Sequence, residues 1–433
     1  MHQRSIEKIP SIAGTRVILG RTQKTGGGII SLGRYFALDG SLGAEVCLDV
    51  TRPHVIFICG KRGYGKSYTI GVFLEEISRL EDDVKNKLGV VVVDTLGIYW
   101  ATRFPNIHEN EDLARWGKKP EGFPLLWLVP SGVVAEYRKH GFDVVCFSLR
   151  VSRLSPAHWC QLFRLNPTDP VSVMITRVVL KMQSTSDSFS ILDMLASING
   201  DARASKEIIA AVENFLAMAE SWGIFSATGM SITDLVQPGR ITVLDLSLLP
   251  TQGLKDIVVS LVSETIFEER VKARKSYEQR RMGLKVEETG IPLVWLAVDE
   301  AQLFIPRNHD TLSKEVLLSE WMRQGRQPGL SLIIATQRPS AVEPEVLSHC
   351  DLILCHRLTA QEDIEMLGMI RPTYMRGDIA ESIRKMGHEK GVALLVDDTS
   401  ETVHVVKVRP RVSWHGGGEP VIDTPACVKD DSG

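Results

Sequence analysis

One short string constrains this chain more than any other feature. Residues 60–67 read Gly-Lys-Arg-Gly-Tyr-Gly-Lys-Ser, directly after the apolar run 55–59 and directly before a stretch with helical character. A strand, this glycine-rich pattern and a helix in that order are typical of a phosphate-binding loop. The glycines let backbone N–H groups wrap phosphates, and the start of the helix favours anions. The alternative is a chance string in a glycine-rich turn, which the flanking strand and helix make much less frequent.

Individual residues of this string have predictable parts. In such loops the lysine reaches the β- and γ-phosphate oxygens and the final hydroxyl can ligate Mg²⁺. These positions are Lys66 and Ser67 here. The residues that we predict to contact the nucleotide are Lys61, Arg62, Gly63, Tyr64, Gly65, Lys66, Ser67 and Tyr68.

A second signal is the apolar run 293–298, which ends in Asp299 and Glu300. A fold with a phosphate-binding loop needs one carboxylate for the magnesium site and one to align the attacking water. We therefore predict that Asp299 binds the metal and that Glu300 acts on the water. Two acids that cap a helix after a strand are the alternative, which the phosphate loop upstream makes weaker.

A third signal is the apolar run 330–336, which ends in the amide side chain of Gln337. At a strand end, Gln337 could sense the γ-phosphate and relay hydrolysis to the surface, although a polar turn residue would look the same. Arg323 and Arg326 lie just before this run, where a cation could reach the nucleotide of a neighbouring subunit. Solvated charges at a helix end are the equal alternative for these arginines.

Apolar runs alternate with helical patterns from residue 54 onward. The runs are 55–59, 90–94, 144–149, 241–247, 293–299, 330–336, 351–355 and 392–397. Runs this apolar are buried on both faces, as in the parallel sheets of α/β proteins. Between 155 and 235 helical spacing replaces them, which predicts a helical insertion in the sheet domain.

The charge balance excludes a general attraction to nucleic acid. Among 433 residues, 50 Lys and Arg stand against 53 Asp and Glu, so the net charge is −3. Any contact with DNA must therefore come from a local patch or from repetition around a ring. The densest basic stretch holds Arg270, Lys272, Arg274, Lys275, Arg280 and Arg281. A solvated helix end explains this stretch as well as a DNA surface does.

The cysteines and the apolar runs indicate a cytoplasmic protein. Seven Cys are scattered without a Cys-x-x-Cys pair or a His cluster at ligand spacing, so we expect reduced thiols. The first residues lack an apolar signal region, and no run reaches the roughly 18 apolar residues of a membrane span. We therefore expect no insertion into a membrane.

Four segments together resemble the HerA/FtsK superfamily of hexameric DNA-pumping ATPases, and its HerA branch most closely. They are residues 60–67, 91–100, 297–304 and 325–358, of which the last is the most specific. The resemblance covers about residues 50–410. It implies a RecA-like α/β sheet of the P-loop NTPase class, with ATP and Mg²⁺ as cofactors.

The resemblance also implies roles for particular residues. The lysine and serine of the phosphate loop keep the parts given above, and Asp299 and Glu300 become the Walker B pair. Gln337 becomes the sensor of the γ-phosphate, and Arg326 the arginine that completes the site of the adjacent subunit, with Arg323 as its substitute. The implied machine is a homohexamer that hydrolyses ATP to translocate or unwind DNA, with duplex DNA in a central channel and a nuclease or another effector as partner.

The patterns along the chain divide it into predicted units. These are residues 1–50 as a short, truncated barrel-like β region, 51–150 and 236–410 as the RecA-like ATPase core, 151–235 as the helical insertion, and 411–433 as a tail or a strap on a neighbour.

The chain departs from the family pattern in three places. Ile98 stands where the family has Glu, so any role of that acid is lost or moved. The N-terminal β region is shorter than the family's barrel, which puts the docking of a nuclease on it in doubt. Gln302 stands near the Walker B pair, where His is common after the alanine, and we expect little effect from this change.

Two other classes of function remain open. A P-loop kinase or a GTPase would share the phosphate loop, but Glu300 beside Asp299 suits activation of water, and no Asn-Lys-x-Asp string for guanine is present. A conjugation or secretion motor of the same superfamily would share the whole site. The lack of a membrane span favours a machine outside the membrane without deciding between them.

Overall fold

A computed structural model of the chain describes residues 11–13, 16–20, 27–37, 39–198, 203–286, 290–369, 379–385 and 387–418. Its centre is a sheet in which 14 of the described strands join in the order β1-β2-β4-β3-β16-β15-β14-β5-β13-β12-β6-β11-β7-β8. The strands from β14 to β8 in this order all run parallel. The predicted α/β fold class is therefore confirmed.

The strands have the following bounds. The parallel part consists of β5 (Val55–Cys59), β6 (Leu88–Asp94), β7 (Leu125–Pro130), β8 (Val145–Phe147), β11 (Ile241–Asp245), β12 (Leu293–Val298), β13 (Leu330–Thr336) and β14 (Leu352–His356). The other strands of this sheet are β1 (Ser11–Ala13), β2 (Arg16–Leu19), β3 (Ile29–Phe36), β4 (Leu42–Asp49), β15 (Val392–Asp397) and β16 (Thr402–Val408). Apart from it, β9 (Leu149–Arg150) pairs with β10 (Phe225–Ser226).

Most strands of the structure coincide with the apolar runs from which we predicted them, with three differences. The run 144–149 divides between β8 and β9. The run 392–397 becomes β15, which lies antiparallel to β14. The strands β7 and β16 lie outside the predicted runs; β7 is as apolar as its neighbours, whereas β16 is only half-buried along much of its length.

The N-terminal strands extend the central sheet. Within the described residues, β3 pairs with β4 on one side and with β16 on the other. The edge strand of this N-terminal group, β3, is thus joined to the C-terminal strand β16. The description of residues 1–50 as a barrel-like unit stays a prediction. The other predicted unit boundaries stay predictions.

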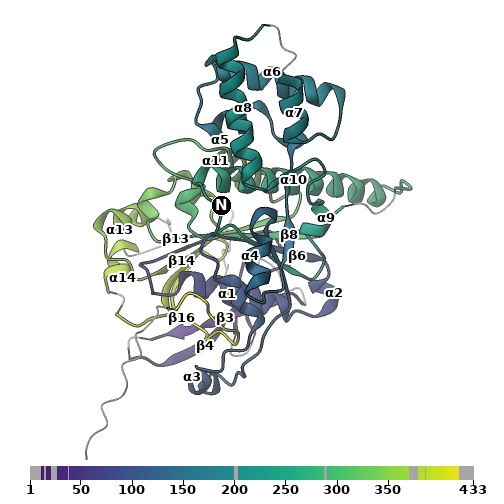
Figure 1. Ribbon diagram of the computed structural model, residues 1–433. Helices are drawn as coiled ribbons and strands as arrows, with labels where there is room; N and C mark the ends of the chain where they lie inside the picture. Colours follow the sequence, from purple (N-terminus) through teal and green to yellow (C-terminus); the bar gives the residue numbers. More distant parts are fainter. Residues whose placement is uncertain are drawn as a thin grey trace, which may run out of the picture.

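Helices cover both faces of the sheet and form the part above it in Figure 1. The longer ones are α1 (Lys66–Ser78), α5 (Pro156–Phe163), α6 (Pro170–Thr185), α7 (Ile191–Ile198), α8 (Lys206–Ser221), α10 (Gln252–Arg281) and α13 (Gln361–Gly368). The short ones are α2 (Asp82–Lys85), α3 (Asn110–Arg115), α4 (Val134–Lys139), α9 (Ile232–Leu235), α11 (Leu312–Val316), α12 (Glu345–His349) and α14 (Ile379–Lys385). Five short 3-10 helices occur among the described residues, namely η1 (Tyr99–Arg103), η2 (Ser131–Val133), η3 (Val151–Arg153), η4 (Ala301–Leu303) and η6 (Pro339–Ala341). A π-helix, η5, spans Leu317–Met322.

Alternation along the parallel strands builds two cores. On β5, Ile56 and Ile58 face the core that contains α1, whereas Phe57 and Cys59 face the core that contains α10 and the insertion. Strands buried on both faces explain why the sequence shows continuous apolar runs rather than alternation. The helices α6, α7 and α8 stand beyond α10 from the sheet, and α5 contacts both α6 and α10. Of the described helices, none combines the length and the hydropathy needed to cross a membrane. A cytoplasmic location stays a prediction.

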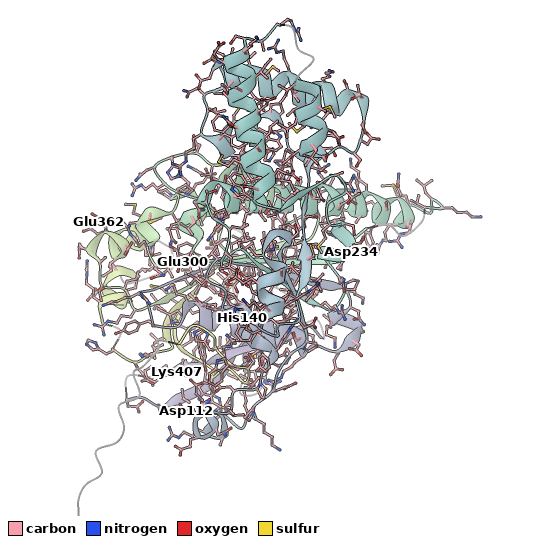
Figure 2. The ribbon with its side chains drawn as sticks, viewed as in Figure 1. Asp112, His140, Asp234, Glu300, Glu362 and Lys407 are labelled. Atoms are coloured by element: carbon pink, nitrogen blue, oxygen red, sulfur yellow. The ribbon has the colours of Figure 1, made fainter. Side chains whose placement is uncertain are left out.

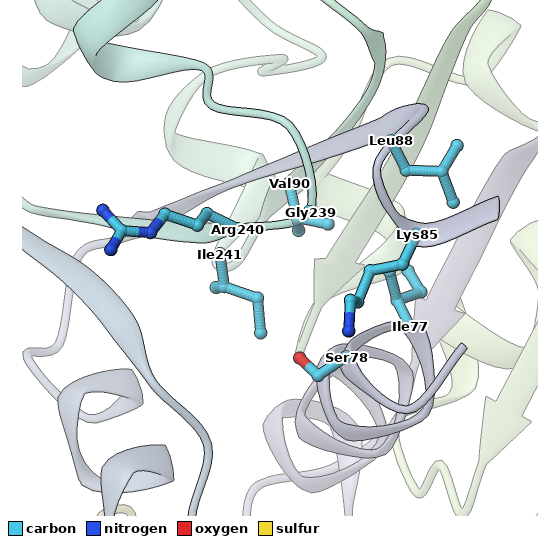
Figure 3. Close-up of a pocket in the computed structure, with 8 residues that line it drawn as sticks. All are labelled: Ile77, Ser78, Lys85, Leu88, Val90, Gly239, Arg240 and Ile241. Carbon is cyan, nitrogen blue, oxygen red and sulfur yellow. The ribbon is translucent and has the colours of Figure 1, made fainter. Parts of the chain in front are cut away.

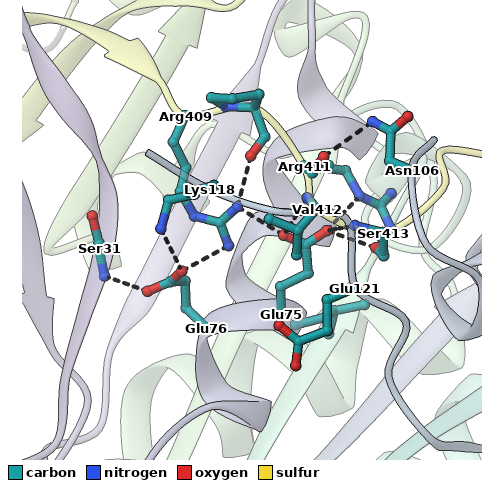
Figure 4. Close-up of polar contacts among 12 residues, drawn as sticks. Ser31, Glu75, Glu76, Asn106, Lys118, Glu121, Arg409, Arg411, Val412 and Ser413 are labelled. Atoms are coloured by element: carbon teal, nitrogen blue, oxygen red, sulfur yellow. Dashed lines mark hydrogen bonds and ion pairs between the residues drawn. The ribbon is translucent and has the colours of Figure 1, made fainter. Parts of the chain in front are cut away.

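The described part of the C-terminal segment, residues 409–418, lies on this chain's own α1, and we call it the strap. Its anchor is Glu75, a fully buried carboxylate on α1 that pairs with Arg409 and Arg411 (Figure 4). Glu75 also accepts hydrogen bonds from the backbone N–H and the hydroxyl of Ser413, at 3.0 and 2.6 Å. The remainder of the predicted tail, with Cys427, lies outside the described residues.

Candidate active site

The phosphate loop joins the end of β5 to the start of α1. Gly65 precedes the helix with φ of 119°, a backbone conformation that favours glycine. Gly60 has φ of 153°, and a Cβ there would lie only 2.6 Å from Cβ of His356 on β14. The two glycines of the pattern are therefore required by the turn and by the strand beneath it.

His356 forms the floor of the loop and was not foreseen from the sequence. It is fully buried, with Nε2 2.9 Å from the hydroxyl of Thr69 and Nδ1 3.1 Å from the carbonyl of Val392. Burial, with a contribution from the charge of Lys66, lowers the pKa of His356 to about 4. The ring is therefore neutral at pH 7 and adds no second cation beneath the loop.

Lys66 is the buried cation of the site. Only 5% of it is exposed. Burial lowers its pKa, and the charges of Asp299 and Glu300 oppose that shift. A desolvated lysine next to carboxylates lies at the start of a helix, where a phosphate group would also be stabilised.

Of the other residues predicted to contact the nucleotide, some are exposed to solvent and some contact other parts of the chain. Lys61, Arg62 and Gly63 are exposed. The ring of Tyr64 lies under the guanidinium of Arg357, 5.6 Å from the ring centre. The hydroxyl of Tyr68 turns to the strap side of α1, where it contacts Glu109 at 3.0 Å and accepts from the backbone N–H of Arg411 at 2.6 Å. The Tyr68 side chain is thus engaged with the strap, and its predicted nucleotide contact would have to come from the backbone.

Asp299 is brought together with Ser67 across 232 positions of sequence. The hydroxyl of Ser67 donates to Oδ2 of Asp299 at 2.6 Å. The hydroxyl of Tyr99 donates to the same oxygen at 2.8 Å. Burial raises the pKa of Asp299, although these two hydrogen bonds oppose the shift.

The paired hydroxyl and carboxylate fit Mg²⁺. This ion prefers oxygen ligands and usually keeps several waters, so one or two protein groups beside the substrate phosphates are enough. No cluster of three or more His, Cys, Asp or Glu side chains suited to a metal occurs within the described ranges. Ser67 and Asp299 are the residues that would hold the ion.

Tyr99 is oriented by the turn that follows β6. Asp94 ends this strand and accepts hydrogen bonds from the backbone N–H groups of Gly97, Ile98 and Tyr99, at 2.7 to 2.8 Å. Asp245, the last residue of β11, lies beside Asp94 in the pairing of β11 with β6. Burial and the charge of Asp245 raise the pKa of Asp94 to about 7. The sequence signal for Tyr99 was its place after a strand end, but nothing in it showed which carboxylate it would reach.

Ile98, which stands where the family has an acid, is covered by the strap. A Cβ on Gly416 would lie 2.7 Å from the carbonyl oxygen of Ile98, and one on Gly417 would lie 3.4 Å from its side chain. The chain therefore places a close-fitting glycine segment over the apolar side chain at this position.

Glu300 is held by two amides at the ends of neighbouring strands. It lies near the centre of the molecule in Figure 2 and is 7% exposed. Its φ of 54° lies in the left-handed region, which is uncommon for a residue other than glycine and recurs at functional sites. Gln337 donates to one carboxylate oxygen, and Gln302 donates to the other at 2.6 Å. The side-chain oxygen Oε1 of Gln302 in turn accepts from the hydroxyl of Thr336 at 2.7 Å. Gln302, from which we expected little effect, is thus part of the contacts around the proposed catalytic acid.

The two candidate arginines lie at the far edge of the sheet. They precede β13, a strand of 7 residues, whereas Gln337 follows it. At about 3.3 Å per residue, this strand separates them from the phosphate loop of their own chain by roughly 20 Å. Arg323 is paired with Glu345, and its Nε donates to Oε1 of that carboxylate at 2.9 Å. Arg326 is exposed, and no partner for its side chain occurs in the part of the chain that the structure describes.

The basic stretch on α10 is largely paired. Arg270 is buried, and its guanidinium binds main-chain carbonyls, so it is not available to DNA. Lys272 pairs with Glu269 at 2.7 Å, and Arg274 pairs with Glu278. The interpretation of this stretch as a DNA surface is therefore weakened at its first residues.

A small pocket lies away from this site. It is lined by the end of α1 and by the first residues of β6 and β11, among them Ser78, Leu88 and Ile241 (Figure 3). In a parallel sheet these strand starts lie at the edge opposite the phosphate loop. We assign the pocket no part in nucleotide binding.

The chain is similar to known proteins of one family. Residues 31–266, more than half of the chain, match the family described as the helicase HerA central domain. The chain is 21% identical over 426 residues to the DNA double-strand break repair helicase HerA of Sulfurisphaera tokodaii, which covers 95% of this chain and 76% of that protein. It is 23% identical over 354 residues to the protein of the same name from Saccharolobus solfataricus, covering 81% of this chain and 63% of that protein.

Among solved structures, VirB4 of Thermoanaerobacter pseudethanolicus is similar in fold. Its TM-score is 0.52 at 15% identity, with 89% of this chain and 97% of that chain covered. At this level of identity the likeness shows the fold alone.

Proposed function

Because this chain belongs to the family of the helicase HerA central domain, we propose that it is a motor that uses ATP hydrolysis to translocate or unwind duplex DNA. The chain is an ATPase of this family. The observation that carries the proposal is the set of contacts around Glu300, in which a catalytic carboxylate is tied to Gln337 at the end of another strand. Such a contact can convert a change at the γ-phosphate into a movement of β13.

In the proposed reaction, Glu300 aligns the water that attacks the γ-phosphate. A carboxylate within a buried site can accept a proton from that water and fix its direction. Both of its oxygens are already engaged, by Gln302 and Gln337, so a water would have to compete with one amide. Gln337 would thereby report whether the site holds a reactive nucleotide.

The phosphates are bound by the loop and by Lys66. The buried ammonium group and the backbone N–H groups of the glycine turn would stabilise the negative charge of the β- and γ-phosphates. Mg²⁺, held by Ser67 and Asp299, would supply further neutralisation of that charge. Tyr99 would keep Asp299 oriented for this purpose.

The site requires a second subunit in this proposal. Arg326 lies too far from its own loop, and it is exposed, so it is suited to the nucleotide of an adjacent copy. An arginine supplied from outside a P-loop site stabilises the charge that develops on the transferred phosphoryl group. We therefore propose a homohexameric ring with Arg326 as the completing residue.

The substrate and partners follow from the relatives rather than from contacts on this chain. The relatives are named as helicases of double-strand break repair. We propose duplex DNA in a central channel and a nuclease or another effector as partner. A net charge of −3 means that the channel must be lined by a local group of basic residues.

The test is ATP turnover with a panel of nucleotides, measured with duplex DNA, single-stranded DNA or no DNA. We expect hydrolysis of ATP that duplex DNA stimulates several-fold, together with a particle mass of six subunits when ATP and DNA are present. The Glu300→Gln variant serves as the matched control, since it should form the same particle without turnover. Turnover that ignores DNA, in a particle of one subunit, would contradict the proposal.

The same panel addresses the other classes. A preference for GTP, or phosphate transfer to a small acceptor, would favour a switch or a kinase. A conjugation or secretion motor remains the closest alternative, because it would share the fold. Stimulation by a protein substrate or by a membrane, but not by duplex DNA, would favour it.

A further inference from the structure

We propose that Arg270 is a positioning residue that holds the turn carrying Arg326 in the orientation needed by the adjacent subunit. This inference rests on the proposed role of Arg326. It gives a function to a residue of the basic stretch that DNA cannot reach, since only 8% of Arg270 is exposed.

The guanidinium of Arg270 joins two segments of backbone. From α10 it donates to the carbonyl oxygen of Pro328 through Nε at 2.8 Å and through Nη2 at 2.6 Å. Through Nη1 it donates to the carbonyl oxygen of Ile291 at 2.6 Å. Pro328 lies two positions after Arg326, and Ile291 lies just before β12, so one side chain ties together the starts of two neighbouring strands.

The turn that Arg270 holds is tightly built. The backbone N–H groups of Gly329 and Leu330 both donate to the carbonyl of Gly325, at 3.1 and 2.9 Å. Gly329 has φ of 85°, and a Cβ there would lie 2.3 Å from the side chain of Leu293 and 3.3 Å from Nη2 of Arg270. The turn therefore fits against Arg270 and β12 in one conformation.

The chemistry of the contact requires arginine. Burial, followed by the charge of Arg274, lowers the pKa of Arg270 to about 10, so the group is still protonated at neutral pH. Its planar fork can serve both carbonyl groups at once, whereas the single ammonium of lysine cannot reproduce that geometry. A buried cation is thus fixed by three hydrogen bonds to main-chain oxygens.

The direction of Arg326 depends on this turn. Its exposed side chain has no partner within the described residues, so the backbone of this turn sets the position of its Cα and the direction of its Cα–Cβ bond. A displacement of about 1 Å in a catalytic group can cost about a hundredfold in rate. Loosening the carbonyl of Pro328 should therefore impair the neighbour's site and leave the subunit's own phosphate loop intact.

The test mixes two kinds of subunit that are inactive alone. Lys66→Ala subunits lack a working phosphate loop but keep Arg326, and Arg326→Ala subunits have the opposite defect. If the arginine acts on a neighbour, mixed rings recover ATP turnover. Arg270→Met is then added to one kind of subunit at a time, and turnover of the mixture is measured.

The expected result is asymmetric. In the Lys66→Ala subunits, which supply the arginine, Arg270→Met should reduce the recovered turnover by about ten- to a hundredfold. In the Arg326→Ala subunits, whose arginine is already gone, it should change turnover less than about twofold. Arg270→Lys should behave like Arg270→Met, and it is the variant to use if the methionine variant does not fold. Arg153→Met is the matched control. It removes an arginine of η3 that pairs with Glu268 on α10, and it should not change turnover in either kind of subunit.

Each contrary outcome has a distinct meaning. An equal loss in both positions, or no loss in either, overturns the role of Arg270 while leaving the shared site standing. If the parent mixture recovers no turnover although mass measurement shows mixed rings, the proposed role of Arg326 fails first, and this inference fails with it.

Discussion

Gln337 donates its side-chain amide to the carboxylate of Glu300, although 37 positions separate the two residues in the chain. The contact joins the ends of β12 and β13, which lie side by side in the sheet. It places the residue proposed to act on water next to the residue proposed to sense the γ-phosphate. The first prediction concerns this pair.

We expect Glu300→Gln to bind ATP with nearly unchanged affinity and to hydrolyse it about 10² to 10⁴ times more slowly, the usual contribution of a general base. The loop, Lys66 and the metal residues stay intact, so the loss should be confined to the chemical step. ATP binding and turnover are measured on the same preparation. Glu362→Gln, an exposed acid on α13, should turn over ATP normally. Normal turnover of the Glu300 variant with a dead Asp299→Asn would mean that the two roles are misassigned.

Tyr99→Phe should raise the Mg²⁺ concentration needed for half-maximal turnover. The substitution removes one of the two hydroxyls that donate to Oδ2 of Asp299, and such a hydrogen bond to a charged group stabilises by about 1.5–3 kcal/mol. Magnesium titrations of turnover and thermal unfolding check this. Tyr137→Phe is the matched control, because Tyr137 donates to a different carboxylate, Asp245, at 2.9 Å. An identical magnesium dependence for both variants would remove Tyr99 from the site.

Glu75→Gln should destabilise the protein and release the strap. It leaves the buried guanidinium of Arg411 without its carboxylate and leaves that of Arg409 with only Glu76. Breaking a buried pair in this way costs about 3–5 kcal/mol. Denaturant unfolding gives the loss of stability, and limited proteolysis shows whether residues 409–418 become accessible. Glu121→Gln breaks only the exposed pair with Arg79 and should cost less than about 1 kcal/mol. Comparable losses for the two variants would show that the strap is not anchored by Glu75.

The contact between His54 and Asp351 predicts a dependence of stability on pH. Burial alone would lower the pKa of His54, but the hydrogen bond and the charge of Asp351 outweigh it and raise the pKa above its usual 6.5. A raised histidine pKa means that the stabilisation is complete below pH 6.5 and is lost as the pH rises through the value in the folded protein. The difference in unfolding free energy between wild type and Asp351→Asn should therefore shrink as the pH rises above about 6.5. A difference that grows over this range would reverse the sign and contradict the assignment.

The sequence was sufficient to predict the location of site residues that directly follow an apolar strand. The phosphate loop, the acid pair and Gln337 each follow an apolar strand, and the carboxyl ends of parallel strands meet at one edge. The neighbourhood of Glu300 and Gln337 could therefore be predicted from their strands. The pairing of β3 with β16 could not be predicted in this way, because it joins residues near opposite ends of the chain.

Other contacts depend on the whole topology. Tyr99 reaches Asp299 over 200 positions, and Arg411 reaches Glu75 over 336. Neither pair has a spacing that local periodicity could reveal. Arg270 illustrates the same limit, since a basic stretch at a helix end gives no sign that its first arginine will be buried against a turn between two other elements.

The most direct test of the account is ATP turnover by Lys66→Ala, measured with saturating duplex DNA beside wild type. Lys66 is the buried cation of the proposed phosphate site. We expect the fold to survive its removal, because Lys66 is the first residue of α1 and belongs to no strand of the sheet. The account predicts that the variant keeps its thermal stability to within about 1–2 kcal/mol and loses at least about 10²-fold in turnover. A folded Lys66→Ala protein that hydrolyses ATP within a few-fold of the wild-type rate would contradict it.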